Sequence, residues 1–483
     1  MANFTQGETR VKLSLADLAT FQASGSVVLD ARRTRPFWFD GRFMAARDLA
    51  REQNYFLQRQ ADLGRAAGFG VIHGLWVDRP AAASKPKDAE TIIIRAGQGI
   101  TPAGELVMIP QDLTLRLSDL PEEQKLDLQF GLSRIPRPPA RTRTGLYVVA
   151  LRPVEFTANP IASYPTSLQG SRTTHDGDIV EATAVTLVPY PDPMTNFDPA
   201  HRRAAVARQI FLMGRPGQLS DAVLPIALLS VQRGTIDWLD PYLVRRDSGP
   251  EFSGVRLGLT DPATQQAFLL QYDAQLQEIL STRQLANLPN PSRFSASDYF
   301  QALPPAGRFP LGSISVDDFS QVFFPQQLDV RLSIIPQDEL PSLIEESMSL
   351  PPIDLTLSAD DYKNIAVFAL IPVPRNGFAA LKASLPDVPL RPTLPQVLGF
   401  RHPIELLRLY KGTVSITLPT PTVNNAWKRA IGQDVFGFYT RRKSMPTFAD
   451  FATALPAPVP PTPAPTPTPL PTPTPIPPRP PNP

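Results

Sequence analysis

The chain of 483 residues contains no cysteine, which excludes disulfide bonds, thiolate chemistry and cysteine-ligated zinc. It has no excess of charge of one sign, because 47 basic residues stand against 45 acidic ones, so nucleic acid is not expected as a partner. No stretch of about 18 apolar residues occurs, and residues 1–21 lack the charged and apolar regions of a secretion signal. We expect a cytoplasmic protein without a transmembrane segment.

The sequence motifs of common enzyme classes are also missing. Gly68, Gly70 and Gly74 follow an expected helix and lack the spacing of a dinucleotide-binding loop, and no phosphate loop, hydrolase elbow or zinc-protease motif occurs. The stretch THDGDIVEAT at 174–183 has residue types that suit a metal, but its spacing matches no metal-binding loop, and we interpret it as a polar turn before a strand from Ile179. The sequence predicts no enzyme, cofactor or metal, although a Ser/His/Asp site assembled only in three dimensions would leave no motif.

Proline is abundant, with 57 residues, and it is concentrated at the C-terminus, where residues 456–483 include 16 prolines. Most backbone N–H donors are missing there, so we expect an extended, proline-rich polyproline-II tail over residues 451–483 rather than a helix or a sheet. Such a tail is either a solvated spacer or a strip that docks on a partner or on the cell envelope.

The remaining prolines and glycines divide the chain into short strands and a few amphipathic helices, which predicts an α+β fold that is mainly β. A turn-rich polar stretch at 246–256 marks an expected boundary between two β-rich domains. The predicted domains are an N-terminal β-rich domain at 1–250 with a helix at 45–64, a C-terminal α+β domain at 251–450, and the tail at 451–483.

Periodicity places individual elements within these domains. Two further helices are expected at 199–213 and from Pro262, where a proline occupies the first helical position. Apolar runs predict strands at 92–94 and 106–109, with turns through Gly97 and Gly99 and at 102–104. Further strands are expected in GLYVVALRPVEF, in IVEATAVTLVPY, and on both sides of a tight turn at Gly234.

The most patterned stretch is residues 36–75, where three aromatics precede a turn, an amphipathic helix follows, and a glycine-punctuated apolar segment closes it. The aromatic rings suit stacking on a sugar or a base, but no basic surround accompanies them. We favour the alternative that they anchor the turn or are covered by a neighbouring subunit. His73 is expected to be a packed, hydrogen-bonded core or interface residue. The predicted assembly residues are Phe37, Trp38, Phe39, Asp40, Gly41, Phe43, Tyr55, Phe56, Gly70 and His73.

The same stretch carries a resemblance to a known family. The residues that carry it are Phe39, Asp40, Gly41, Arg42 and Phe43, then Glu52, Gln53, Tyr55 and Phe56, then Gly68, Gly70, Val71, Gly74 and Leu75, and finally Gly99, Gly104, Glu105 and Pro110. Their order is similar to a recurrent pattern in structural proteins of phage-tail-like contractile injection systems. The stretch ELPSLIEESMSLPPI at 339–353 more faintly resembles the trimeric baseplate component of type VI secretion systems. Ala45, His73 and Thr101 depart from the pattern, which usually has a helix-capping Thr or Ser, a small residue and an Asp there.

The resemblance implies a non-enzymatic structural component at or near the baseplate of a contractile injection particle. Its expected partners are other particle components and further copies of itself, and the proline-rich tail would reach a partner or the envelope. The expected location is the cytoplasm, within a particle that is either envelope-associated or released. The alternative is a peripheral recognition protein for a glycan or a cell surface, which would need exposed tryptophans, and a polysaccharide hydrolase would need two facing carboxylates.

Overall fold

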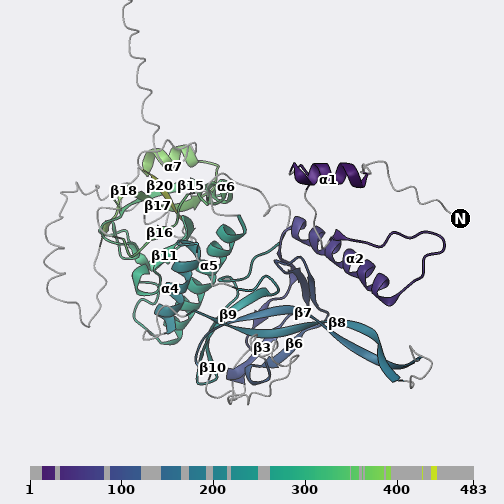
Figure 1. The fold of residues 1–483 in the computed structure, drawn as a ribbon. Coiled ribbons are helices and arrows are strands. Elements are labelled where there is room, and N and C mark those ends of the chain that lie inside the picture. The colour runs from purple at the N-terminus through teal and green to yellow at the C-terminus, as the bar shows by residue number, and fades with distance from the viewer. Residues whose placement is uncertain are drawn as a thin grey trace, which may run out of the picture. The chain divides into compact units, whose positions relative to one another are not determined.

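The computed structural model describes residues 14–24, 26–27, 33–80, 88–120, 143–164, 173–191, 199–214, 219–248, 262–348, 350–357, 362, 365–385, 388–392, 427 and 437–442. The chain forms two compact units (Figure 1). The first comprises residues 1–291, 295–307 and 348–357, and the second comprises residues 292–294, 308–347 and 358–483. The predicted polyproline tail lies outside the described residues.

The first unit is built around an antiparallel four-stranded sheet with the strand order β10-β9-β7-β8. Two three-stranded antiparallel sheets, β1-β4-β5 and β2-β3-β6, accompany it. The strands are β1 (Gly70–Gly74), β2 (Val77–Asp78), β3 (Thr91–Ile94), β4 (Gly97–Ile100), β5 (Leu106–Ile109), β6 (Leu113–Arg116), β7 (Gly145–Ser163), β8 (Thr173–Tyr190), β9 (Leu224–Gln232) and β10 (Thr235–Asp240). The chain is therefore α+β and mainly β, as the sequence predicts.

Both faces of the four-stranded sheet are buried in separate apolar clusters. Val149 and Leu151 of β7 pack with residues of the two small sheets, whereas Val148 and Ala150 pack with helices α4 (Pro199–Phe211) and α5 (Pro262–Leu285). This alternation follows the two-residue period of a strand. The rings of Phe211 and Phe268 stack between the two helices, with 4.5 Å between their centroids. The first unit thus has small sheets on one face of the central sheet and helices on the other.

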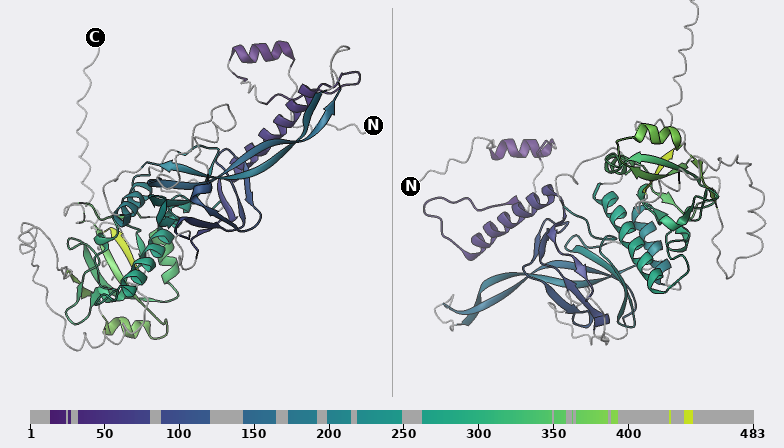
Figure 2. Two further views of the ribbon diagram at one scale, coloured as in Figure 1. Left: turned by 90° about the horizontal axis from the view of Figure 1, so that it is seen from below. Right: turned by 180° about the vertical axis from the view of Figure 1, so that it is seen from behind.

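The strands β7 and β8 continue well beyond the sheet. Residues 154–163 pair with residues 173–182, but β9 pairs with β7 only over residues 145–151. Both views of Figure 2 show this distal part as a two-stranded ribbon that leaves the four-stranded sheet. We call residues 154–163 and 173–182 the arm.

Helix α5 belongs to the first unit, so the compact units do not divide at the expected boundary near residue 250. Its buried stripe includes Phe268, Tyr272 and Leu276, and Tyr272 contacts Phe300 at 5.2 Å between ring centroids. The expected boundary stretch 246–256 lies outside the described residues from residue 249 onward, and α5 packs on the face of the sheet left open by the small sheets. The short strands β11 (Ala302–Leu303) and β16 (Ile353–Asp354) pair in the same unit.

The second unit has a mixed sheet in which β15 (Asp329–Pro336) and β17 (Ile365–Val373) run parallel over eight residue pairs. The strands β20 (Gly437–Arg442) and β18 (Val388–Pro389) flank this pair in antiparallel orientation. Four phenylalanines, Phe294, Phe309, Phe323 and Phe324, form a buried aromatic cluster. The other elements are α6 (Leu340–Ser347), α7 (Phe378–Ser384), β12 (Ala306–Arg308), which spans the change of unit, β13 (Ile314–Ser315), β14 (Ser320–Gln321) and β19 (Arg391–Pro392).

Two turn predictions are wrong. Gly97 and Gly99 lie within β4, because a Cβ at Gly99 would lie 2.7 Å from the carbonyl oxygen of Gly70 on the neighbouring strand; glycine here permits close strand approach. Residues 174–178, expected as a polar turn before a strand from Ile179, lie in β8 and form part of the arm. The structure confirms the tight turn at Gly234, whose φ of +85° follows Arg233 at +51°.

Candidate assembly surface

The aromatic entry segment lies along helix α2 (Ala46–Ala67) and presents its phenylalanine rings to solvent. Phe37, Phe39 and Phe43 are 72%, 60% and 95% exposed. Polar contacts hold the segment: the Arg42 guanidinium donates to the carbonyl of Phe37 at 2.5 Å and to the Asp48 carboxylate at 2.8 Å. The aromatics therefore do not anchor the turn by burial. They form an exposed apolar strip that the backbone and arginine contacts keep in place.

Helix α2 exposes an apolar stripe of its own. Leu49, Phe56 and Leu63 recur every seven residues, which places them on one face of a helix, and all three are exposed. Tyr55 is half-buried and lies under the Arg35 guanidinium at 5.9 Å, so it holds the entry segment rather than facing outward. A long amphipathic helix whose apolar stripe faces water indicates an interaction surface.

The helix is held to the small sheets near its C-terminal end. A Cβ on Gly64 would collide with the Gly104 carbonyl, and a Cβ on Gly104 would collide with the Ala61 carbonyl, so the two backbones touch. The Arg65 guanidinium also donates to the carbonyl of Ala103 at 2.7 Å. This anchor fixes one end of α2 and leaves its long apolar stripe uncovered.

The predicted site residues after the helix have different roles. Gly70 is buried, and a Cβ there would lie 2.7 Å from the carbonyl oxygen of Arg246, so this glycine serves packing inside the first unit. Asp40 and Gly41 form the exposed turn, with Gly41 at a φ of +91°. His73 is not a core residue: its side chain is exposed, because the register shift between Val71 and His73 interrupts the strand alternation, and its place in an interface stays a prediction.

The arm is an exposed element that sequence reasoning missed. Its side chains face solvent on both faces of the ribbon, including Phe156, Ile161 and Ile179 at 50%, 59% and 66% exposure. It carries four carboxylates, Glu155, Asp176, Asp178 and Glu181, and no lysine or arginine. The signal available in the sequence was that two predicted strands, at 145–156 and 179–190, follow each other in the chain.

Carboxylates cluster where the arm leaves the sheet. Glu155 and Glu181 are directly opposite each other on the paired strands, an arrangement that is unfavourable for like charges. Partial burial, together with the charges of Glu181 and Glu155, raises the pKa of Glu105 above its ordinary value. The base of the arm thus gathers three carboxylates, while Arg152 lies on β7 just before the arm and the charge of Arg65 acts to lower the pKa of Glu105.

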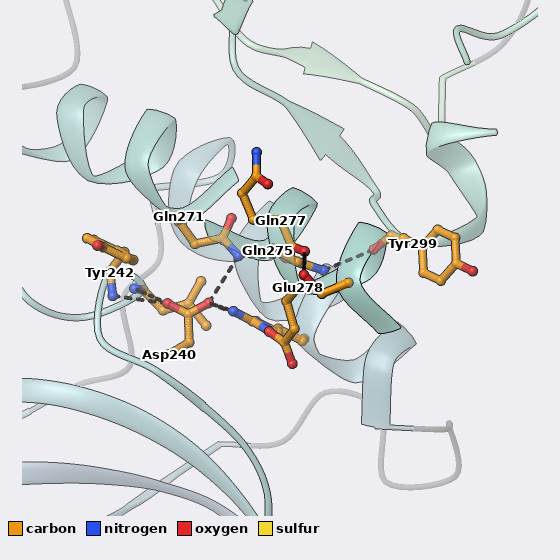
Figure 3. Close-up of polar contacts among 10 residues, drawn as sticks. Asp240, Tyr242, Gln271, Gln275, Gln277, Glu278 and Tyr299 are labelled. Atoms are coloured by element: carbon orange, nitrogen blue, oxygen red, sulfur yellow. Dashed lines mark hydrogen bonds and ion pairs between the residues drawn. The ribbon is translucent and has the colours of Figure 1, made fainter. Parts of the chain in front are cut away.

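The arrangement most similar to an enzyme site is a buried polar network between β10, α4 and α5 (Figure 3). The fully buried Asp240 carboxylate accepts hydrogen bonds from the Arg203 guanidinium at 2.8 Å, the Gln271 amide at 3.1 Å and the Tyr242 backbone N–H at 3.0 Å. Arg203 also pairs with Glu278 at 2.6 Å. Both oxygens of Asp240 have partners within the protein, so the network joins the strand end to two helices and offers no free acid or base.

The tryptophans do not form a sugar-binding cleft. Trp238 and Trp427 are buried. The rings of Trp38 and Trp76 are partly exposed, but guanidinium groups already lie over them, Arg42 at 5.0 Å and Arg245 at 3.8 Å from the ring centroids. A guanidinium therefore already occupies one face of each of these rings.

The described part of the chain contains no group of three or more His, Asp or Glu residues arranged to hold a metal. No described helix is both long and apolar enough to cross a membrane. A pocket of about 280 Å³ lies between α2 and the turn before β5, but its Arg33 and Arg65 both pair with Asp62. Among the described residues, the exposed apolar faces of α2, the entry segment and the arm are therefore the best candidates for an interaction surface.

No protein-family model and no curated protein matches the chain. Among solved structures, it shows a likeness to the crystal structure of TssK, with 13% identity over 53% of this chain and 50% of that chain, at a TM-score of 0.24. A chain of the type VI secretion TssK-TssF-TssG baseplate subcomplex is 12% identical over 52% of this chain and 71% of its own, with a TM-score of 0.21. A chain of the type VI secretion baseplate complex is 15% identical over 53% of this chain and 71% of its own, with a TM-score of 0.18. The chain spans about half the length of the TssK chain that it matches. At these scores the likeness establishes neither a common fold nor a common function.

Proposed function

We propose that this protein is a non-enzymatic structural component of a phage-tail-like contractile injection particle, at or near its baseplate. The observation that carries the proposal is the exposed apolar surface formed by the entry segment and α2, which the first unit holds in place but does not cover. Exposed phenylalanines and leucines on a fixed helix are typical of protein interfaces. The sequence resemblance of this same stretch supplies the class of particle.

Co-sedimentation tests the proposal. Full-length protein, a chain ending at Ala454, and a Phe43→Ser, Phe56→Ser variant would be mixed with fractions enriched in contractile particles and followed by negative-stain imaging. We expect the full-length protein to sediment with the particles and the double variant to lose this binding. Met213→Ser is the matched control, because Met213 is 49% exposed but lies outside the proposed surface.

Each outcome has a defined meaning. Loss of binding in the chain ending at Ala454 would indicate that the proline-rich tail contacts a partner. Unchanged binding would indicate that the tail is a spacer. A full-length protein that never sediments with particles would contradict the structural proposal.

A further inference from the structure

Two elements of the first unit expose apolar side chains, and they differ in charge. The segment of residues 33–67, which contains α2, has seven arginines and four carboxylates, a net charge of +3. The arm has four carboxylates and no lysine or arginine, a net charge of −4. Apolar faces of opposite charge complement each other, because contact buries both faces and neutralises both charges.

The charges are available for pairing. Among the described residues, Arg47, Arg51 and Arg59 of α2 have no ion-pair partner. On the arm, Glu155 and Glu181 face each other across the strands. An arginine from outside the chain would relieve this repulsion, and an arm contact with α2 of another copy supplies one.

We infer that the arm of one copy of this protein lies on the exposed face of α2 and the entry segment of a second copy. Contact between two arms would bring their carboxylates together, and contact between two α2 faces would bring together their arginines. The favourable contact therefore joins two different surfaces and is head-to-tail. Such contacts produce a closed ring or an open filament rather than a two-fold dimer. The inference deepens the proposed assembly function by naming the partner as the chain itself.

Charge reversal tests the contact. Glu155→Arg with Glu181→Arg reverses the charge of this facing pair and takes the arm from −4 to 0, and Arg51→Glu with Arg59→Glu takes the segment of residues 33–67 from +3 to −1. We expect sedimentation-velocity analysis to show oligomers for the full-length protein and at least a tenfold weaker association for either variant. A chain that carries both pairs of substitutions regains association, and so does an equimolar mixture of the two variants, because each substituted pair then meets a pair of opposite charge.

The control is Arg79→Glu, a charge reversal at an exposed position outside both surfaces, which should leave association unchanged. A monomeric full-length protein, or oligomers that neither reversal weakens, would overturn the inference. The proposed function is judged separately by particle binding. A monomer that binds particles would contradict the head-to-tail contact and support the proposed function. Oligomers that bind no particle would support the contact and contradict the proposed function.

Discussion

At the scale of single residues, two glycines decide how α2 is attached. Gly64 and Gly104 lie in direct backbone contact, and Gly104 has a φ of +91°, a conformation that other residues adopt at a cost. Gly41 has the same φ of +91° but has no atom within 4 Å of the place where a Cβ would lie. A comparison of the same substitution at the two positions therefore distinguishes the cost of the backbone conformation from the cost of the steric clash.

We expect Gly104→Ala to lower the free energy of unfolding by about 1–3 kcal/mol more than Gly41→Ala, because the added methyl group collides with the Ala61 carbonyl. Urea unfolding followed by circular dichroism measures both values. Equal losses at the two positions would show that α2 does not rest on Gly104.

Glu105 gives a pH prediction. Its folded pKa is raised by partial burial and by Glu181 and Glu155, so the ionised form is less favourable in the folded state than in the unfolded state. Its contribution to stability is present below the unfolded pKa of about 4.3 and is lost as pH rises through the folded pKa. Glu105→Gln should therefore raise the urea midpoint at pH 7.5 and leave it unchanged at pH 3.5. An equal effect at both pH values would indicate a cause other than ionisation.

At the scale of elements, the sequence predicts what is buried better than what is exposed. Apolar runs locate β9 and β10, and amphipathic periodicity locates α2, expected at 45–64 and observed at Ala46–Ala67. The arm escapes prediction because both its faces meet water, so no apolar alternation is required, and Asp176-Gly177-Asp178 has the composition of a turn. Phe37 and Phe39 are exposed, and their contact with a partner stays a prediction.

The buried network could not be predicted, because its members are distant in sequence and charged. Arg203 lies 37 residues from Asp240 and 75 residues from Glu278, and nothing in the helix 199–211 distinguishes Arg203 from a solvated residue. Only packing of α4 and α5 on β10 brings the three together. A buried arginine that remains charged requires such partners.

We expect Arg203→Leu to destabilise the first unit by about 3–5 kcal/mol, because it leaves the buried Asp240 carboxylate without its counter-charge. Thermal unfolding of the variant measures the loss. Arg95→Gln is the control, since Arg95 pairs with Asp78 and Asp112 at the surface, and no measurable change is expected there. An Arg203→Leu variant as stable as the control would mean that the network is not what joins the strand to the helices.

At the scale of the whole molecule, a net charge of only +2 conceals a strong separation of charge within the first unit. The arm is acidic and the α2 segment is basic, so two copies attract each other at these surfaces although the protein as a whole is nearly neutral. Composition alone therefore predicted no nucleic-acid partner and could not reveal a self-complementary pair of surfaces. That pair depends on the fold, which exposes both elements.

The separation of charge leads to a dependence on salt. Screening shortens the range of attraction from about 10 Å at 0.1 M to about 3 Å at 1 M ionic strength, so self-association should weaken steeply between these conditions. The apolar contacts of Phe56 and Ile179 resist salt, and a weaker residual association should persist at 1 M. Sedimentation velocity across this range measures both components. Association that is unaffected by salt would assign the contact to the apolar faces alone, and the arm carboxylates would then have no part in it.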